Sequence, residues 1–182
     1  MEALEIVNRD IIPALETVGQ GFEKKTMYLP QLLMSAEAAQ SAFEQIKAQL
    51  KTNASDSVSK GRVVIATVQG DIHDIGKNLV AMMLKNYGFE VIDLGKDVPR
   101  ETIIREAKAH DAKIIALSAL MTTTMQEMRE VVRYARQEGV NAYVMIGGAV
   151  ITQEYADEIG AEGYSKDAAE AVRLAQRLLH LL

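Results

Sequence analysis

Short apolar runs alternate with helix-like stretches over the last two thirds of the chain, and this alternation limits the available folds more than any other feature. Runs rich in β-branched residues occur at RVVIATV (62–68), EVIDL (90–94), KIIALSAL (113–120), AYVMIGG (142–148) and, more weakly, AEGYS (161–165). Helix-like stretches follow at 76–87, 100–109, 124–138, 152–159 and about 167–181. Strands that are apolar throughout are typical of a parallel sheet covered on both faces. Five such units predict an α/β fold, a flavodoxin-like doubly wound five-stranded parallel sheet.

The N-terminal part of the sequence contains only helical patterns. Apolar residues recur at three- and four-residue spacing from Leu4 to Val18, which predicts an amphipathic helix. Pro13 interrupts this pattern, so we expect a kink or a break there, and a second helix should begin near Pro30. The polar, serine-rich stretch that follows is typical of a linker. We therefore expect a helical cap at residues 1–52, a linker at 53–61 and a Rossmann-like domain at 62–182.

The composition excludes several classes of protein. The 182 residues include no cysteine, which excludes disulfides and thiolate metal sites. The net charge is −5 and no basic stripe with interleaved aromatic residues occurs, so we expect no nucleic-acid partner. No apolar run is long enough for a membrane span, and the charged N-terminus lacks the pattern of a signal peptide. We expect a cytoplasmic protein with no membrane partner.

Polar residues and glycines gather directly after three of the expected strands. These stretches are GDIHDIG (70–76), SALMTTT (118–124) and GGA (147–149). The carboxyl ends of parallel strands share one edge of the sheet, and doubly wound domains bind their ligands at that edge. The three stretches therefore predict a single site.

Three familiar chemistries fit the first stretch poorly. A phosphate-binding P-loop has the pattern G-x-x-x-x-G-K-[ST], but here five residues separate the glycines and Asn78 replaces the hydroxyl. A phospho-receiver needs an aspartate at the end of the third strand, where this chain has Leu117 and Ser118. A zinc site needs three or four protein ligands, but the other histidines, His110 and His180, fall in later helices.

A single histidine can still hold a metal that arrives inside a macrocycle with most of its ligands supplied. Asp71 and His73 are two residues apart, so in an extended segment they point to the same side. The carboxylate could then accept the other imidazole N–H and raise the basicity of the ligand. The alternative is a loop histidine that only bonds to its neighbours.

The other two stretches suit the same kind of ligand. Ser118, Leu120 and Thr122 also share one side of an extended segment and would offer hydroxyl groups to a long polar group. Gly147 and Gly148 would let a flat ring approach the backbone, although two glycines after a strand can equally form a simple turn.

The three stretches together match one family. GDIHDIGKN has the D-x-H-x-x-G signature of B12-binding domains, and SALMT and IGGA match the family's S-x-L and GG patterns. The chain resembles the corrinoid-binding region of cobalamin-dependent methionine synthase and the related corrinoid proteins of methyltransferase systems. The resemblance covers nearly the whole chain, and MYLPQLLMSAEA is similar to the family's helical cap. It implies that cobalamin is the cofactor, bound base-off, with its benzimidazole tail in the sheet's core and His73 as the cobalt ligand.

The resemblance also assigns roles to residues. Asp71 would accept a hydrogen bond from His73, and Thr124 would complete this relay. The Tyr164–Ala168 segment would close the pocket. The residues that would bind the cofactor in the α/β part are Gly70, Asp71, Ile72, His73, Asp74, Ile75, Gly76, Ser118, Leu120, Thr122, Gly147, Gly148, Tyr164 and Ala168. In the cap, the residues that would shield the cobalt-bound methyl group are Phe22, Tyr28, Leu29 and Leu32, although ordinary helix packing would bury them as well.

By the same resemblance, the chain is a methyl carrier that alternates between methylcobalamin and cob(I)alamin. Its partners would be methyl-donor and methyl-acceptor methyltransferase domains or subunits and a reductive activation partner. It would not be a complete catalyst alone. The stretch LMTTTMQEM favours a methionine synthase type, with methyltetrahydrofolate as donor and homocysteine as acceptor.

Other interpretations of the same signature remain open. They are a corrinoid carrier of a methanol or methylamine methyltransferase, a regulatory or sensor module that binds B12, the small domain of an adenosylcobalamin mutase, and a flavodoxin-like scaffold without cofactor. The family's cap is usually a bundle of four helices, and about two helices precede the linker here. We therefore expect a partial cap from a fragment of a larger enzyme.

Overall fold

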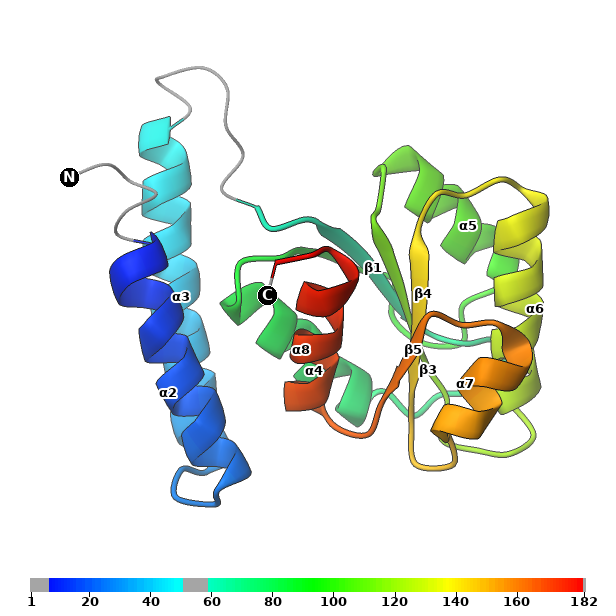
Figure 1. Cartoon of the computed structure of the whole chain (residues 1–182), viewed down its shortest axis with the longest axis horizontal. Coiled ribbons are helices and arrows are strands. Elements are labelled where there is room, and N and C mark those ends of the chain that lie inside the picture. Colours follow the sequence, from blue (N-terminus) through cyan, green and yellow to red (C-terminus); the bar gives the residue numbers. More distant parts are fainter. Residues whose placement is uncertain (1–6, 51–58, 182) are drawn as a thin grey trace. The chain divides into compact units, whose positions relative to one another are not determined.

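The computed structural model describes residues 7–50 and 59–181, and the chain divides into a helical unit and an α/β unit (Figure 1). Most of the linker expected at residues 53–61 lies outside the described residues. None of the described helices combines the length and the hydropathy that a membrane span requires.

The helical unit consists of a π-helical turn, η1 (Val7–Ile11), and two helices, α2 (Ile12–Glu23) and α3 (Leu29–Leu50). η1 runs directly into α2, and Pro13 lies in the first turn of α2, where it has no N–H to donate to the preceding turn. The break expected at Pro13 is therefore a change of helix type. At the start of α3, the side chain of Gln31 accepts the backbone N–H of Tyr28 at 2.7 Å, which fixes this end of the helix.

The α/β unit contains a five-stranded sheet in the order β2-β1-β3-β4-β5. Every neighbouring pair of strands is parallel. The strands are β1 (Arg62–Thr67), β2 (Glu90–Asp93), β3 (Ile114–Ser118), β4 (Tyr143–Gly147) and β5 (Gly163–Ser165). This strand order is that of flavodoxin-like doubly wound domains, so the fold class predicted from the sequence is confirmed.

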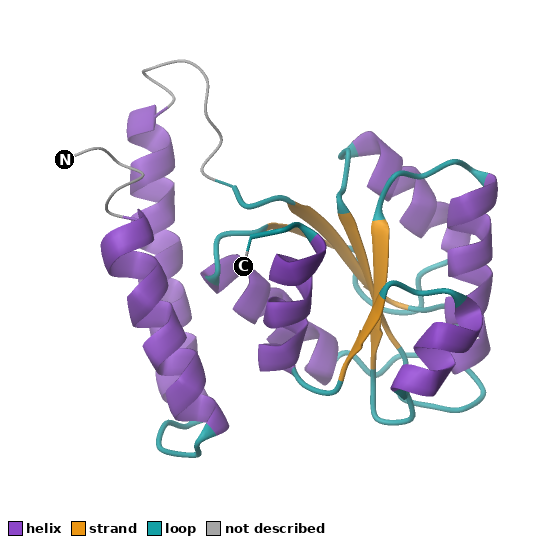
Figure 2. Cartoon of the chain, in the orientation of Figure 1, coloured by secondary structure: helices purple, strands orange, loops and turns teal. Residues whose placement is uncertain are grey.

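Five helices cover the sheet. They are α4 (Ile75–Asn86), α5 (Arg100–Ala109), α6 (Met125–Gln137), α7 (Gln153–Ile159) and α8 (Ala168–Leu178). Helices α5, α6 and α7 lie on one face, and α4 and α8 lie on the other (Figure 2). Each stretch that the sequence predicted to be helical is a helix, with small shifts at the ends. Both faces of the sheet are covered, which explains why its central strands are apolar throughout.

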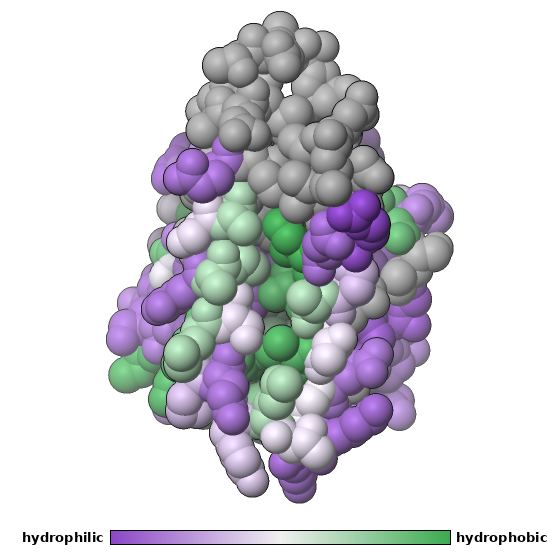
Figure 3. Space-filling view, turned by 90° about the vertical axis from the view of Figure 1, so that its left-hand side faces the viewer, coloured by the Kyte–Doolittle hydropathy of each residue, from purple (hydrophilic) through white to green (hydrophobic). Residues whose placement is uncertain are grey.

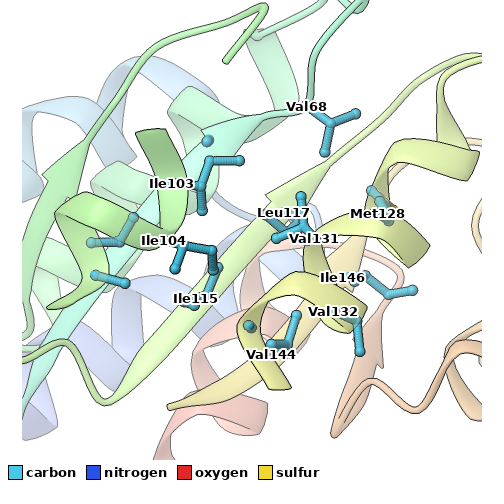
Figure 4. Packing of buried hydrophobic residues seen from close by; sticks show 14 of the residues in the cluster. Val68, Ile103, Ile104, Ile115, Leu117, Met128, Val131, Val132, Val144 and Ile146 are labelled. Carbon is cyan, nitrogen blue, oxygen red and sulfur yellow. The ribbon is translucent and has the colours of Figure 1, made fainter. Parts of the chain in front are cut away.

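The main core lies between the sheet and helices α5 to α7 (Figure 4). Ile115 and Val144 project from the sheet and are fully buried against Ile104 of α5 and Met128 and Val131 of α6. Burial of each such side chain contributes about 1.5–3 kcal/mol. This packing gives the carboxyl edge of the sheet a rigid support.

Candidate functional site

The loop between β1 and α4 carries His73 at the carboxyl edge of the sheet. The buried hydroxyl of Thr67, the last residue of β1, donates a hydrogen bond to the carbonyl oxygen of His73 at 3.3 Å. The backbone N–H of Asp71 donates to the carbonyl oxygen of Val68 at 3.1 Å. The loop is therefore folded back onto the strand that precedes it.

Asp71 is completely buried behind His73 and accepts hydrogen bonds on both carboxylate oxygens. Its Oδ1 accepts the backbone N–H of His73 at 3.0 Å and lies 2.8 Å from Nδ1 of the same residue. Its Oδ2 accepts the backbone N–H of Leu120 and the hydroxyl of Thr124, each at 2.7 Å. Burial raises the pKa of this carboxyl, but the donors outweigh burial and hold the pKa of Asp71 well below its usual range.

The charge on Asp71 determines which nitrogen of His73 is free. An ionised carboxylate only accepts hydrogen bonds, so in this contact the proton is on Nδ1. The Nε2 lone pair of the neutral ring then remains for a metal or a proton. The His73 side chain is 47% exposed, so Nε2 is accessible.

Large aliphatic side chains are exposed around this histidine. Ile72, Ile75 and Leu120 come from the same edge of the sheet, and Ile75 is 87% exposed. Such side chains suit a large ligand with an apolar face better than a hydrated ion.

A cavity of about 550 Å³ lies beside His73, between the sheet and helices α4 and α8. Its walls are mostly apolar, with Ile65, Ala116 and Met145 from three strands and Leu79 and Val80 from α4. The predicted site residues that line it are Ile72, His73, Asp74, Ile75, Gly76, Ser118, Leu120, Gly147, Gly148 and Ala168. The size and the lining are those of a site for a sizeable organic group.

The other predicted residues of the α/β unit lie outside the cavity wall. Asp71 and Thr124 stand behind His73, and Gly70 precedes them in the loop. Thr122 is exposed in the turn after β3. Tyr164 packs on the opposite face of the sheet, against the main core. Its neighbour Ser165 lines the cavity instead, because successive side chains of a strand point to opposite faces.

The four predicted cap residues lie in the helical unit. Leu32 is buried, Phe22 is half-buried, and Tyr28 and Leu29 are exposed. Their role as a shield for a methyl group stays a prediction.

Gly148 has a backbone conformation and a spacing that only glycine allows. Its φ is +145°, and a Cβ atom there would lie 1.8 Å from the carbonyl oxygen of Ala119. At Gly147, a Cβ atom would lie 3.0 Å from the carbonyl oxygen of Ser165. The loops after β3 and β4 and the end of β5 thus meet directly at the cavity.

The Tyr164–Ala168 segment, predicted to close the pocket, lines the cavity with Ser165, Lys166, Asp167 and Ala168, and Ala149 of the predicted GGA stretch lines it as well. Sequence reasoning missed the rest of the wall, which comprises Ile65, Lys77, Leu79, Val80, Ala116, Leu117, Met145 and Ile146. Periodicity could have found some of them. Ala116 and Met145 lie two residues before Ser118 and Gly147, so they share a face with them. Leu79 lies one helical turn after Ile75 in α4.

The described residues include no group of three or more His, Cys, Asp or Glu side chains that could hold a metal ion. A metal at His73 would therefore need its other ligands from elsewhere, which a macrocycle supplies. The single free imidazole nitrogen, the exposed aliphatic side chains and the apolar cavity fit such a group.

The families and relatives that match this sequence also bind a metal-containing macrocycle. Two family models, each described as a B12 binding domain, match residues 1–47 and 61–173. The chain is 42% identical to dimethylamine corrinoid protein 1 of Methanosarcina acetivorans over 181 residues, which cover 98% of this chain and 84% of the relative. It is 41% identical to trimethylamine corrinoid protein 1 of Methanosarcina mazei over 174 residues, with coverages of 94% and 81%.

A solved structure resembles the chain over nearly its whole length. It is the methanol:cobalamin methyltransferase complex of Methanosarcina barkeri, with a TM-score of 0.84 and 28% identity over 98% of this chain and 68% of that chain. The family match covers the His73 loop and the cavity, and the relatives are more than 40% identical. The chain therefore belongs to the B12-binding domain family, whose cofactor is cobalamin.

Proposed function

We propose that this chain is the corrinoid protein of a methylamine methyltransferase system. In this function it would bind cobalamin with His73 as a ligand of the cobalt, and it would carry a methyl group between two methyltransferase partners. The observation that carries the proposal is the His73 ring, oriented by a buried carboxylate beside an apolar cavity. The cobalt of the bound cofactor supplies the chemistry, because it accepts a methyl group and gives it up again.

Residues of the chain determine which nitrogen of His73 carries the proton. Asp71 keeps the proton on Nδ1, so Nε2 of His73 would be the nitrogen that holds the cobalt, with its basicity raised by the carboxylate. The backbone N–H of Leu120 and the hydroxyl of Thr124 hold the Asp71 carboxylate in place behind His73.

The cavity accounts for the rest of the cofactor. Its apolar walls suit the benzimidazole group, and Ser118 and Ser165 offer hydroxyl groups for the polar part of the tail. In the helical unit, Phe22, Tyr28, Leu29 and Leu32 are our candidates for the shield of the methyl group.

The relatives favour a methylamine as methyl donor. Two of them are a dimethylamine and a trimethylamine corrinoid protein of Methanosarcina. This supports the alternative in our sequence analysis, a methanol or methylamine carrier, better than the methionine synthase type. The methanol complex supports a methyltransferase subunit as partner.

The first experiment tests the axial ligand. The purified chain is mixed with hydroxocobalamin, and its absorption spectrum should be that of a base-off, histidine-ligated corrinoid. His73→Ala should lose the histidine-ligated spectrum. His110→Ala is the matched control, because His110 follows α5 and is absent from the cavity wall, and it should behave as wild type. An unchanged spectrum in His73→Ala would refute the proposed ligand.

The second experiment identifies the donor. The cobalamin-loaded, reduced chain is mixed with a methyltransferase specific for mono-, di- or trimethylamine or for methanol, and methylation is followed by absorption. We expect methylation with a methylamine. Methylation by methyltetrahydrofolate and its methyltransferase alone would restore the methionine synthase interpretation.

A further inference from the structure

The segment between β2 and α5 runs beside the start of the His73 loop. The backbone N–H of Thr67 donates to the carbonyl oxygen of Gly95 at 2.9 Å, and that of Val98 donates to the carbonyl oxygen of Thr67 at 3.1 Å. Val68 and Val98 form a parallel bridge beyond the ends of the two strands. The segment is therefore held in a fixed register against the residues that lead into the loop.

Asp97, within this segment, contacts the loop at two points. Its Oδ1 accepts the backbone N–H of Gly70 at 2.7 Å. Its own backbone N–H donates to the carbonyl oxygen of Asp71 at 3.0 Å. Asp97 thus holds Gly70 and Asp71, and Asp71 is the residue that orients His73.

The backbone of Asp97 is left-handed, with φ at 54°. Such a conformation is unfavourable for residues other than glycine, although aspartate tolerates it better than most. Unfavourable conformations of this kind often occur at functional sites. Glycine would relieve the strain but would have no side chain to accept the Gly70 N–H.

A second contact joins the same two parts of the chain at the far end of the loop. Lys77 is buried, and its Nζ lies 2.6 and 2.7 Å from the two carboxylate oxygens of Asp93 at the end of β2. The residues from Gly70 to Lys77, with His73 in the middle, are therefore fixed at both ends by the region from Asp93 to Asp97.

We propose that Asp97 is a positioning residue for the cobalt ligand. By holding Gly70 and Asp71 it fixes the carboxylate that orients the imidazole of His73. The inference rests on the proposed function of His73, but its first consequence concerns the chain without cofactor. Loss of the Asp97 side chain should loosen bonds that Asp97 does not itself make, namely those of the Asp71 carboxylate.

Amide hydrogen exchange, measured by NMR on the chain without cofactor, tests this consequence. The reporters are the amides of His73 and Leu120, which donate to the carboxylate of Asp71. In Asp97→Gly, we expect both to exchange roughly five- to tenfold faster, the size expected for the loss of one hydrogen bond. Asp97→Asn should restore the wild-type rates, because its amide oxygen can accept the Gly70 N–H and asparagine tolerates φ near 54°.

Asp111→Gly is the matched control. Asp111 is also left-handed, with φ at 47°, but it precedes β3 at the amino edge of the sheet. This variant should leave the exchange of His73 and Leu120 unchanged, and equal acceleration there would show a general loosening and overturn the inference.

The second measurement is the spectrum after addition of hydroxocobalamin. Asp97→Gly should lower the histidine-ligated fraction, Asp97→Asn should restore it, and Asp111→Gly should match wild type. Unchanged exchange, or an unchanged spectrum, in Asp97→Gly would overturn the positioning role. If exchange accelerates but wild type itself shows no histidine ligation, the proposed function fails while the hold of Asp97 on Asp71 stands.

Discussion

The two units of the chain differ in how completely they bury their apolar residues. In the α/β unit, the middle residues of the central strands and the inner faces of α5 and α6 are buried. In the helical unit, the buried apolar residues among the described side chains are Leu15, Leu32 and Ala39, whereas Tyr28, Leu29, Leu33 and Met34 are exposed. Apolar side chains run down the middle of the face shown in Figure 3, with polar ones at its margins.

We relate this difference in burial to two different tasks, a fixed site in the α/β unit and a movable cover in the helical unit. A sheet covered on both faces can hold the Asp71–His73 pair in one geometry. Two helices that leave apolar side chains exposed suit a surface that covers another group and uncovers it again, as the proposed methyl shield must.

The largest effect should come from the core of the α/β unit. Ile115→Ala should lower the free energy of unfolding by about 2–5 kcal/mol, because it leaves a cavity among closely packed side chains. Leu33→Ala, at a 42% exposed position of α3, should cost roughly 1 kcal/mol or less. Urea unfolding followed by circular dichroism measures both values. Equal losses would contradict the contrast between the units.

A smaller effect should come from the buried carboxylate. Asp71→Asn should lower the free energy of unfolding by about 1–3 kcal/mol at neutral pH, because an amide cannot accept all the bonds that the carboxylate accepts. The check is urea unfolding of both proteins over a range of pH.

The difference in free energy of unfolding between wild type and Asp71→Asn should depend on pH. The pKa of Asp71 is lowered in the folded chain, so its contribution to stability is complete above the unfolded pKa of about 3.9. It is lost as the pH falls from there toward the lower folded pKa. The stabilities of wild type and Asp71→Asn should therefore converge in acid, and a constant difference would show that the charge of Asp71 does not stabilise the fold.

The smallest effect should come from the helical unit. Met34 is 70% exposed on α3, so Met34→Gln should change the free energy of unfolding by no more than about 0.5 kcal/mol. Met128→Gln is the matched change in the main core, and it should be strongly destabilising because it buries an amide. A large loss in Met34→Gln, by the same urea measurement, would mean that this face of α3 is covered.

Local patterns in the sequence predicted most of the α/β unit. The alternation of apolar runs and helical stretches gave the fold class and the order of the elements, because each pattern reflects burial of one element at a time. The spacing of Asp71 and His73 predicted a contact between carboxylate and imidazole. In the structure, Oδ1 of Asp71 lies 2.8 Å from Nδ1 of His73.

Contacts between distant segments could not be predicted in this way. The hydrogen bonds of Asp97 to the His73 loop and of Lys77 to Asp93 depend on how β1 and β2 align, which no local pattern specifies. The direction of Tyr164 was missed for a similar reason, since a strand as short as β5 gives no clear alternation. The proposed methyl donor was inferred from the relatives, because no local pattern in this chain specifies it.

The cavity between the sheet and helices α4 and α8 also links the stability of the chain to its ligand. The apolar side chains that line this space of about 550 Å³ stay in contact with water until a ligand covers them. By mass action, free cobalamin at 100 times its dissociation constant would add about 2.7 kcal/mol to the free energy of unfolding. Vitamin supply would then control the abundance of the protein, because a starved cell would degrade the empty chain faster than the filled one.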